Sequence, residues 1–181
     1  DPLDGDRVNR VAWMDAFVGN PPFLGGSTIW PNLGGEYRDW LATIRESVHG
    51  NGDLCAHFLR RSCDLLGANG AAGFIVTNTI SQGDTRSTGL QALVTTRQVL
   101  IYDATVGLRW PGEADATVCV VHLAIGNTKH RASPARLNGR EVLSIDSSLR
   151  AGSERPDPTP LQSNVGLSFK GVTLYGQGFL L

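Results

Sequence analysis

The sequence lacks the motifs of several large enzyme classes. It has no GxxxxGK[ST] phosphate loop, and its evenly spaced glycines Gly67, Gly70 and Gly73 lie between a predicted helix and a predicted strand. A dinucleotide fingerprint needs the reverse order, with the strand before the glycines and the helix after them. The nucleophile elbow GxSxG is missing as well. These absences remove the usual sequence support for P-loop, dinucleotide-binding and serine-hydrolase chemistry.

Cysteine is scarce, and metal-ligand spacings are missing. The three cysteines (Cys55, Cys63 and Cys119) lie in apolar segments and form no CxxC pair, which predicts buried thiols in a reducing compartment. The four histidines form no ligand-spaced cluster, so no metal site is predicted. There is no secretory signal and no apolar run of about eighteen residues. We therefore expect a soluble cytoplasmic protein that does not contact a membrane.

Excess charge of one sign is also lacking. The 181 residues carry a net charge of −1 and are 41% hydrophobic, which predicts one domain with a real core and excludes a wholly basic nucleic-acid wrapper. Charge is unevenly distributed along the sequence, however, because the stretch from Lys129 to Arg155 contains six Lys and Arg residues but only three acidic residues. Such a stretch is either a solvated surface or a surface that faces phosphates.

The hydrophobic pattern predicts alternating strands and helices. Asp53 is a plausible N-cap for a helix that Gly67 ends, Asn69-Gly70 is expected to form a turn, and Gly83–Thr88 is expected to be a polar loop before a short helix. Further predicted segments are a buried strand Ala12–Val18, a helix Gly34–Val48 and strands Ala72–Thr77, Val99–Tyr102 and Thr117–Leu123. This order predicts an α/β sheet whose last strands are antiparallel.

The tetrapeptide Asn20-Pro21-Pro22-Phe23 directly follows the first predicted strand. Asn20 offers a side-chain acceptor, and Pro21 offers a carbonyl on a backbone that two proline rings hold extended. Phe23 offers a flat surface for stacking. Two acceptors beside a stacking surface suit the exocyclic amine of a base turned out of a duplex. The ordinary alternative is a plain turn that happens to contain an aromatic residue.

Several blocks in order resemble the catalytic half of DNA amino-methyltransferases of the adenine-N6 kind, in particular the large fused type II restriction–modification enzymes. Val18–Gly26 resembles the (D/N/S)PP(Y/F) motif with its strand. Gly52–Phe58 resembles the following helix, which borders the cofactor pocket, and Gly70–Asn78 resembles the next strand. Other matching blocks are Thr79–Arg86, Trp110–Gly112 with Ala116–His122, and Phe169–Phe179, which leads toward a target-recognition region.

The resemblance implies a Rossmann-like class I methyltransferase sheet that uses S-adenosylmethionine and acts on double-stranded DNA. Asn20, Pro21, Pro22 and Phe23 would be catalytic, with Asn20 also beside the cofactor. Asp53 is either a cofactor contact or simply the helix N-cap. Thr85 and Arg86 are candidate DNA contacts, although the sequence favours the alternative of a polar loop with no such role.

One part of the family pattern is not found. The glycine-rich first strand and turn, with the acidic residue that binds the cofactor ribose, should lie upstream of the motif, and nothing before Asp15 supplies it. We therefore expect a fragment. Residues 1–150 would form the second half of the sheet, mostly parallel with a late antiparallel strand, and 151–181 a linker and the start of the recognition region. The rest of the same polypeptide would be its partner.

Two alternatives remain open at this point. Asn-Pro-Pro-aromatic motifs also occur in enzymes that methylate a protein glutamine amide or an amino group in RNA, and cytosine N4 is a second possible DNA acceptor. A chain without the cofactor-binding half could instead be a non-catalytic module that binds DNA. The Thr79–Arg86 block and the long tail favour DNA as the substrate.

Overall fold

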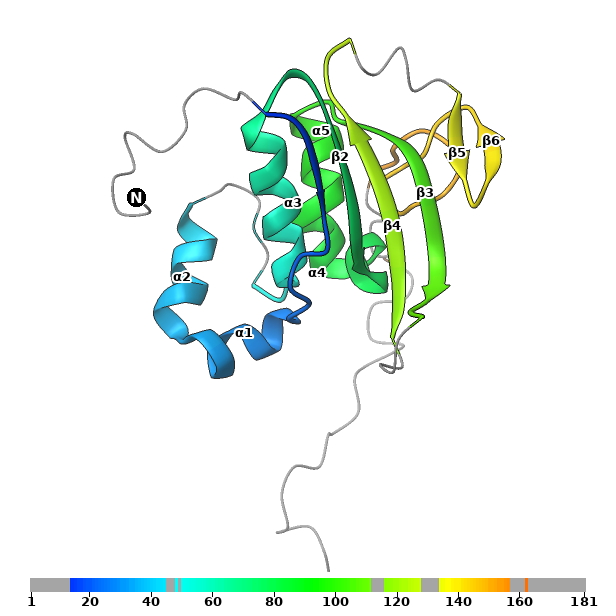
Figure 1. Cartoon of the computed structure of the whole chain (residues 1–181). Coiled ribbons are helices and arrows are strands. Elements are labelled where there is room, and N and C mark those ends of the chain that lie inside the picture. Colours follow the sequence, from blue (N-terminus) through cyan, green and yellow to red (C-terminus); the bar gives the residue numbers. More distant parts are fainter. Residues whose placement is uncertain are drawn as a thin grey trace, which may run out of the picture.

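The computed structural model describes residues 14–44, 48, 50–111, 116–127, 134–156 and 162. A six-stranded sheet in the order β1-β2-β4-β3-β5-β6 forms its centre (Figure 1). The strands are β1 (Met14–Gly19), β2 (Leu66–Thr77), β3 (Leu100–Arg109), β4 (Thr117–Ala124), β5 (Ala135–Leu137) and β6 (Arg140–Val142). β1, β2, β3 and β5 run in one direction, while β4, inserted between β2 and β3, and β6 run in the other. This confirms the predicted α/β fold with a late antiparallel strand.

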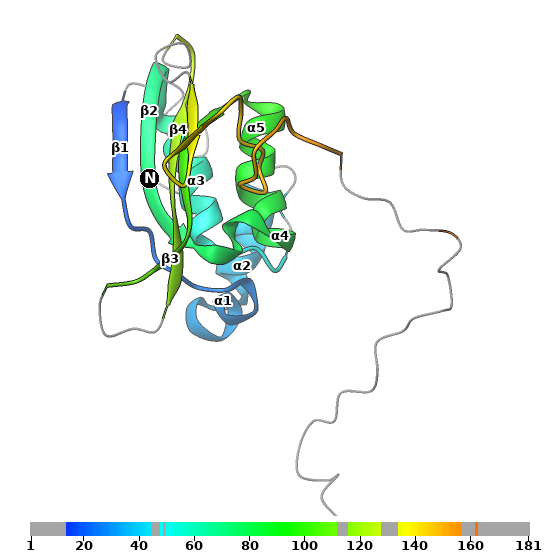
Figure 2. The same ribbon diagram turned by 90° about the vertical axis from the view of Figure 1, so that its right-hand side faces the viewer.

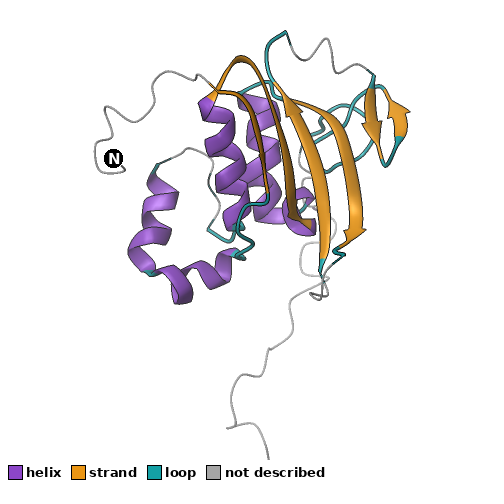
Figure 3. Ribbon diagram, viewed as in Figure 1, coloured by secondary structure: helices purple, strands orange, loops and turns teal. Residues whose placement is uncertain are grey.

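Helices cover one face of this sheet. Figure 2 shows α3, α4 and α5 together on one side of the strands, and Figure 3 separates the helical layer from the sheet by colour. The helical segments are α1 (Gly26–Leu33), α2 (Gly35–Thr43), α3 (Leu54–Leu65), the 3₁₀ turn η1 (Asn78–Ser81), α4 (Gly83–Arg86), the π-helical turn η2 (Ser87–Gln91) and α5 (Ala92–Thr96). The helix predicted over Gly34–Val48 is therefore shorter than expected, and the polar loop predicted over Gly83–Thr88 is helical.

The core lies between that helical layer and the sheet. Successive residues of β2 alternate between buried and half-buried from Gly70 onward, as expected for a strand with one covered face. Gly89 allows close packing of η2 on α3, because a Cβ added there would lie 3.0 Å from the Cβ of Ala56. The largest fully buried side chains include Leu59, Ile80, Leu90, Leu93, Ile101 and Leu123.

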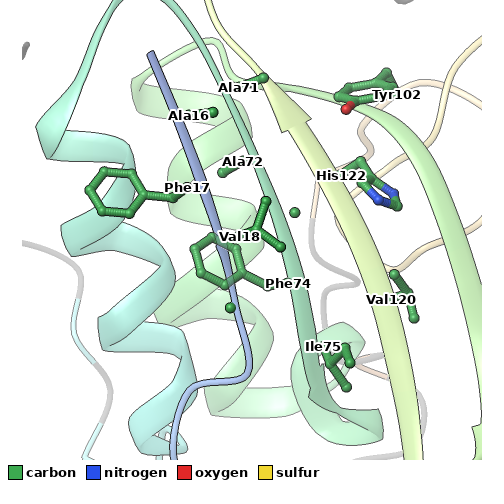
Figure 4. A pocket seen from close by; sticks show the side chains of 12 residues that line it. Ala16, Phe17, Val18, Ala71, Ala72, Phe74, Ile75, Tyr102, Val120 and His122 are labelled. Atoms are coloured by element: carbon green, nitrogen blue, oxygen red, sulfur yellow. The ribbon is translucent and has the colours of Figure 1, made fainter. Parts of the chain in front are cut away.

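The opposite face of the sheet is bare among the described residues. Val18 is 90% exposed there, and its strand partner Gly73 lies opposite His122 of β4. A shallow apolar hollow of about 330 Å³ runs over this part of β1, β2 and β4, with Tyr102 and His122 at its rim (Figure 4). The prediction of a buried first strand is therefore wrong. Within the described chain, β1 pairs with β2 alone and forms an edge of the sheet.

Two further local expectations differ from the structure. Asn69-Gly70 is not a turn but part of β2, where the Asn69 side-chain oxygen accepts a hydrogen bond from the backbone N–H of Asn127 at 2.8 Å. The β5–β6 hairpin was not predicted, although its turn Asn138-Gly139 has positive φ at both positions (51° and 76°), the arrangement typical of a tight hairpin.

The far ends of the chain carry several untested predictions. The segments predicted for residues 1–13 and Phe169–Leu181 lie outside the described residues. The first residue of the expected linker, Ala151, is part of the folded structure, because it forms a β-bridge with Ile145. None of the helices that the structure describes has the length and apolar character needed to cross a bilayer.

Candidate methyl-transfer site

The Asn20–Phe23 motif begins where β1 ends. Asn20 follows Gly19, the last residue of that strand, and its side chain is exposed. Pro21 is buried and fixes the backbone, whereas Pro22 is exposed and the ring of Phe23 is 39% exposed. In open α/β sheets, ligands bind outside the carboxyl ends of parallel strands. The motif thus has an accessible amide and an accessible ring at the end of the sheet where a ligand is expected.

The backbone directly after the motif is attached to the start of α3. The Leu24 carbonyl accepts a hydrogen bond from the Leu54 N–H at 2.9 Å, and the Leu24 N–H donates to Oδ1 of Asp53 at 3.4 Å. Asp53 is 5% exposed, and the same Oδ1 accepts from the N–H of Cys55 at 2.9 Å. The predicted N-cap of this helix is confirmed. Contact between Asp53 and a cofactor stays a prediction.

A cavity of about 690 Å³ opens at the same end of the sheet. Its walls come from the start of α1 (Gly25 to Ser27), from the loop before α3 (Asn51 and Asp53), and from the ends of β2 and β4. Thr77 of β2 pairs with Val118 of β4, so the carboxyl end of one strand and the amino end of the other meet here. The remaining lining residues are Asn78, Thr79, Thr85, Ala116 and Thr117.

Most of these polar lining residues were not identified from the sequence. Asn78 directly follows the buried strand β2, and a polar residue at the carboxyl end of a parallel strand is itself a signal for a site. Asn51 carries no such signal, because it lies in an irregular loop that reaches the cavity only through the fold. Asn78 also accepts a hydrogen bond from the Cys119 thiol at 3.4 Å, which links β4 to the cavity wall.

The Cys55 thiol lies just behind this wall and is not poised for chemistry. Burial, followed by the negative charge of Asp53, raises the pKa of Cys55 to about 12. Its sulfur lies 3.5 Å from the hydroxyl of Thr77. At neutral pH the group is therefore a protonated thiol, which is a poor nucleophile. The prediction that the cysteines are buried and free of disulfides is confirmed, because all three cysteines are buried free thiols.

Thr85 and Arg86, the predicted DNA contacts, lie in α4 and take part in contacts within the protein. Thr85 is 6% exposed, and its hydroxyl accepts a hydrogen bond from the Asp53 N–H at 3.1 Å. Arg86 forms an ion pair with Glu154 at 3.1 Å and donates to the hydroxyl of Ser147 at 2.8 Å. Contact between either residue and DNA stays a prediction.

The basic stretch from Lys129 to Arg155 is partly described. Its four described arginines are exposed and are spread over β5, β6 and the segment that follows them. They are Arg136, Arg140, Arg150 and Arg155. Lys129 and Arg131 lie outside the described residues. Exposure is required for contact with phosphates but does not distinguish it from ordinary solvation.

Comparison with known proteins places these observations in context. The family model described as Eco57I restriction-modification methylase matches residues 10–102, which include the motif, α3 and β2. No curated protein matches the chain. Among solved structures, the chain is similar to a Type IIL restriction-modification enzyme, MmeI, whose structure was determined in complex with DNA. The TM-score is 0.62 at 20% identity over 79% of this chain, and the match spans 21% of that enzyme.

Proposed function

This chain belongs to the Eco57I restriction-modification methylase family, and from that premise we propose that the protein transfers a methyl group from S-adenosylmethionine to the exocyclic amine of a flipped DNA base, with adenine N6 as the acceptor. The observation that carries the proposal is the exposed Asn20 amide at the carboxyl end of β1, the same end of the sheet at which a cavity lined by polar groups opens, although Asn20 itself is not among the residues that line this cavity. The alternative acceptors, a glutamine amide or RNA, have no comparable support from the family match.

The described residues fit one side of a cofactor site. Asn20 is exposed at the carboxyl end of the edge strand β1. In such a sheet, ligands bind outside the carboxyl ends of the parallel strands, so a cofactor bound there would lie against Asn20. No described segment is a glycine-rich strand-to-helix turn of the kind that holds an adenosyl group. The described chain would therefore contact the reacting end of S-adenosylmethionine, which supplies an electrophilic methyl group when it is bound.

The chain's own residues orient the acceptor amine. The Asn20 side-chain carbonyl and the Pro21 backbone carbonyl would each accept a hydrogen bond from one N–H of the acceptor amine. These two bonds would turn the lone pair of the amine nitrogen away from the two carbonyls. Phe23 would stack on the base, a contact worth on the order of 1–3 kcal/mol. Rate acceleration then comes from orientation and from fixed dipoles around the amine, without a covalent intermediate on the protein.

The test is methyl transfer by the full-length protein that carries this sequence. Labelled S-adenosylmethionine is supplied with duplex DNA, with RNA or with a glutamine-containing peptide, and the labelled nucleoside is identified by mass spectrometry. We expect label in N6-methyladenine. Label in N4-methylcytosine would correct the acceptor, and label in RNA or peptide alone would overturn the proposal.

Replacement of Asn20 by alanine tests the site itself. Because Asn20 is exposed, Asn20→Ala should leave the unfolding midpoint unchanged and lower methyl transfer by at least about a hundredfold. Asn32→Ala is the matched control. Asn32 is an exposed asparagine in α1 whose side chain bonds only locally, to the carbonyl of Thr28 at 2.8 Å. Near-normal turnover by Asn20→Ala would remove Asn20 from the mechanism.

A further inference from the structure

The residue that follows the catalytic motif is held from outside the motif. Both backbone polar groups of Leu24 are bonded to the start of α3: its carbonyl to the Leu54 N–H at 2.9 Å, and its N–H to the Asp53 carboxylate at 3.4 Å. Phe23 directly precedes Leu24, and β1 directly precedes Asn20. The motif is therefore fixed at one end by the sheet and at the other end by the first turn of a helix.

Asp53 is itself fixed by three contacts. Its Oδ1 atom accepts from Cys55 at 2.9 Å in addition to Leu24, and its own N–H donates to the Thr85 hydroxyl at 3.1 Å. Both Asp53 and Thr85 are almost fully buried, at 5% and 6% exposure. Hydrogen bonds to an ionised acceptor in such surroundings are stronger than those between neutral groups at the surface. The carboxylate thus has little freedom to move relative to α3 and α4.

We propose that Asp53 is a positioning residue for methyl transfer, and that Thr85 holds Asp53 in place. Asp53 does not touch the reacting atoms in this scheme; it orients the Asn20–Phe23 backbone through the Leu24 N–H. A displacement of about 1 Å at a catalytic group lowers the rate on the order of a hundredfold. A hydrogen bond to Leu24, the residue after Phe23, can therefore affect the rate through the position of the motif. This inference rests on the methyl-transfer function proposed above. The role it assigns to Asp53 differs from the cofactor contact that was predicted from the sequence as one of two possibilities.

Three substitutions separate the possible roles of Asp53. Asp53→Asn keeps an oxygen at Oδ1 and so keeps both bonds. Asp53→Ser keeps a cap for α3, because serine is a favoured N-cap, but its shorter hydroxyl lies farther from Leu24. Thr85→Val removes the hydroxyl that holds Asp53 and keeps the side-chain shape. Thr95→Val is the control, since Thr95 is an exposed helical threonine whose hydroxyl bonds only to the carbonyl of Gln91.

The first readout is exchange of the Leu24 amide hydrogen with solvent, followed by NMR, which does not depend on activity. We expect exchange to be about 2- to 10-fold faster in Asp53→Ser, as expected for the loss of one hydrogen bond, and near the wild-type rate in Asp53→Asn. Thr85→Val should follow the serine variant, and Thr95→Val should match the wild type. Unchanged exchange in Asp53→Ser would overturn the positioning role, whether or not the protein methylates DNA.

The second readout is kinetic and uses the full-length protein with its DNA substrate. We expect kcat to fall about tenfold or more in Asp53→Ser, with Asp53→Asn restoring most of it, and the Kd for S-adenosylmethionine to stay within about twofold in both. A tenfold rise in that Kd with unchanged kcat would make Asp53 a cofactor contact instead. An inactive wild-type protein would contradict the proposed function, and the amide exchange would still decide the role of Asp53.

Discussion

Gly26, the first residue of α1, has no room for a side chain. A Cβ atom added there would overlap the backbone carbonyl of Asn51, and both residues line the cavity. Its neighbour Gly25 differs, because an added Cβ would meet nothing closer than the Thr28 hydroxyl at 3.9 Å. Gly25 also has an ordinary φ of −57°. The two adjacent glycines therefore have different reasons to be present, and one of them defines the shape of the site.

We predict that Gly26→Ala destabilises the protein by about 1–3 kcal/mol, because the α1 start and the Asn51 loop must separate. Gly25→Ala should be neutral or stabilise by up to about 1 kcal/mol, since alanine restricts the unfolded chain without strain in the native one. Urea unfolding of both variants beside the wild type measures the difference. Equal effects at the two positions would show that the loop moves freely and that the close approach is not a constraint.

The two ends of β2 show how far sequence patterns predicted the elements. Its apolar half, Ala72–Thr77, was correctly predicted as a strand, but a continuous apolar run indicates a strand covered on both faces, whereas its residues alternate between buried and half-buried. Its first half was missed because Asn69-Gly70 is a turn signal, yet Gly70 is buried and an added Cβ would lie 2.8 Å from the Leu66 side chain. Tertiary packing outweighs the local preference there, and packing cannot be read from a dipeptide.

The helical run from Gly83 to Thr96 was predicted only in part, because its first residues, Gly83–Thr88, were expected to form a polar loop before a short helix. It begins with polar residues and changes at Ser87 to a π-helical turn, which interrupts the 3.6-residue spacing that identifies an amphipathic helix. The motif Asn20–Phe23 was identified from the sequence because it is contiguous, and its catalytic role stays a prediction. The cavity walls, by contrast, come from segments that only the fold brings together.

At the same scale, α4 is attached to the segment that follows the sheet. Glu154 accepts from the Ser147 N–H and hydroxyl, both at 2.7 Å, and pairs with Arg86 at 3.1 Å. The two side chains of the ion pair are 15% and 19% exposed, so this pair is largely shielded from solvent. The first residues of the expected linker are thus attached to α4 through Arg86, which directly follows Thr85.

We predict that Glu154→Gln lowers the free energy of unfolding by about 1–3 kcal/mol, because the change removes the charge from a carboxylate that contacts both Arg86 and Ser147 in a largely buried place. Asp39→Asn is the control, since Asp39 pairs with Arg38 at the surface, where the side chains are 48% and 71% exposed. That change should stay within about 0.5 kcal/mol. Chemical denaturation of both variants tests this, and an equally small effect for Glu154→Gln would mean that the segment is only loosely attached.

For the molecule as a whole, burial of the thiols makes stability depend on pH in the alkaline range. Burial raises the pKa values of Cys55, Cys119 and Tyr102 above their ordinary values. The folded protein therefore keeps protons that the unfolded chain releases. For Cys55 this window runs from the ordinary 9.0 to about 12, and within it the free energy of unfolding falls as pH rises.

We predict that Cys55→Ala makes this decline less steep by about 1 kcal/mol per pH unit, because one retained proton is removed. The variant is also less stable at neutral pH through lost packing, but that cost does not depend on pH and cancels from the slope. Urea unfolding between pH 9.5 and 10.5, compared for variant and wild type, measures the slope. Parallel slopes would show that Cys55 does not titrate differently in the folded state.

The insertion of β4 between β2 and β3 divides the folding of the sheet into an early and a late part. β3 and β4 pair across a short connection, so little chain entropy is lost when they meet. β1 pairs with β2 only after the long stretch that carries α1, α2 and α3 has been placed, and its other edge is unpaired in the described chain. We expect β1 to join the nascent sheet last. The Asn20–Phe23 motif at its end would then become ordered only in chains whose remaining sheet is already assembled.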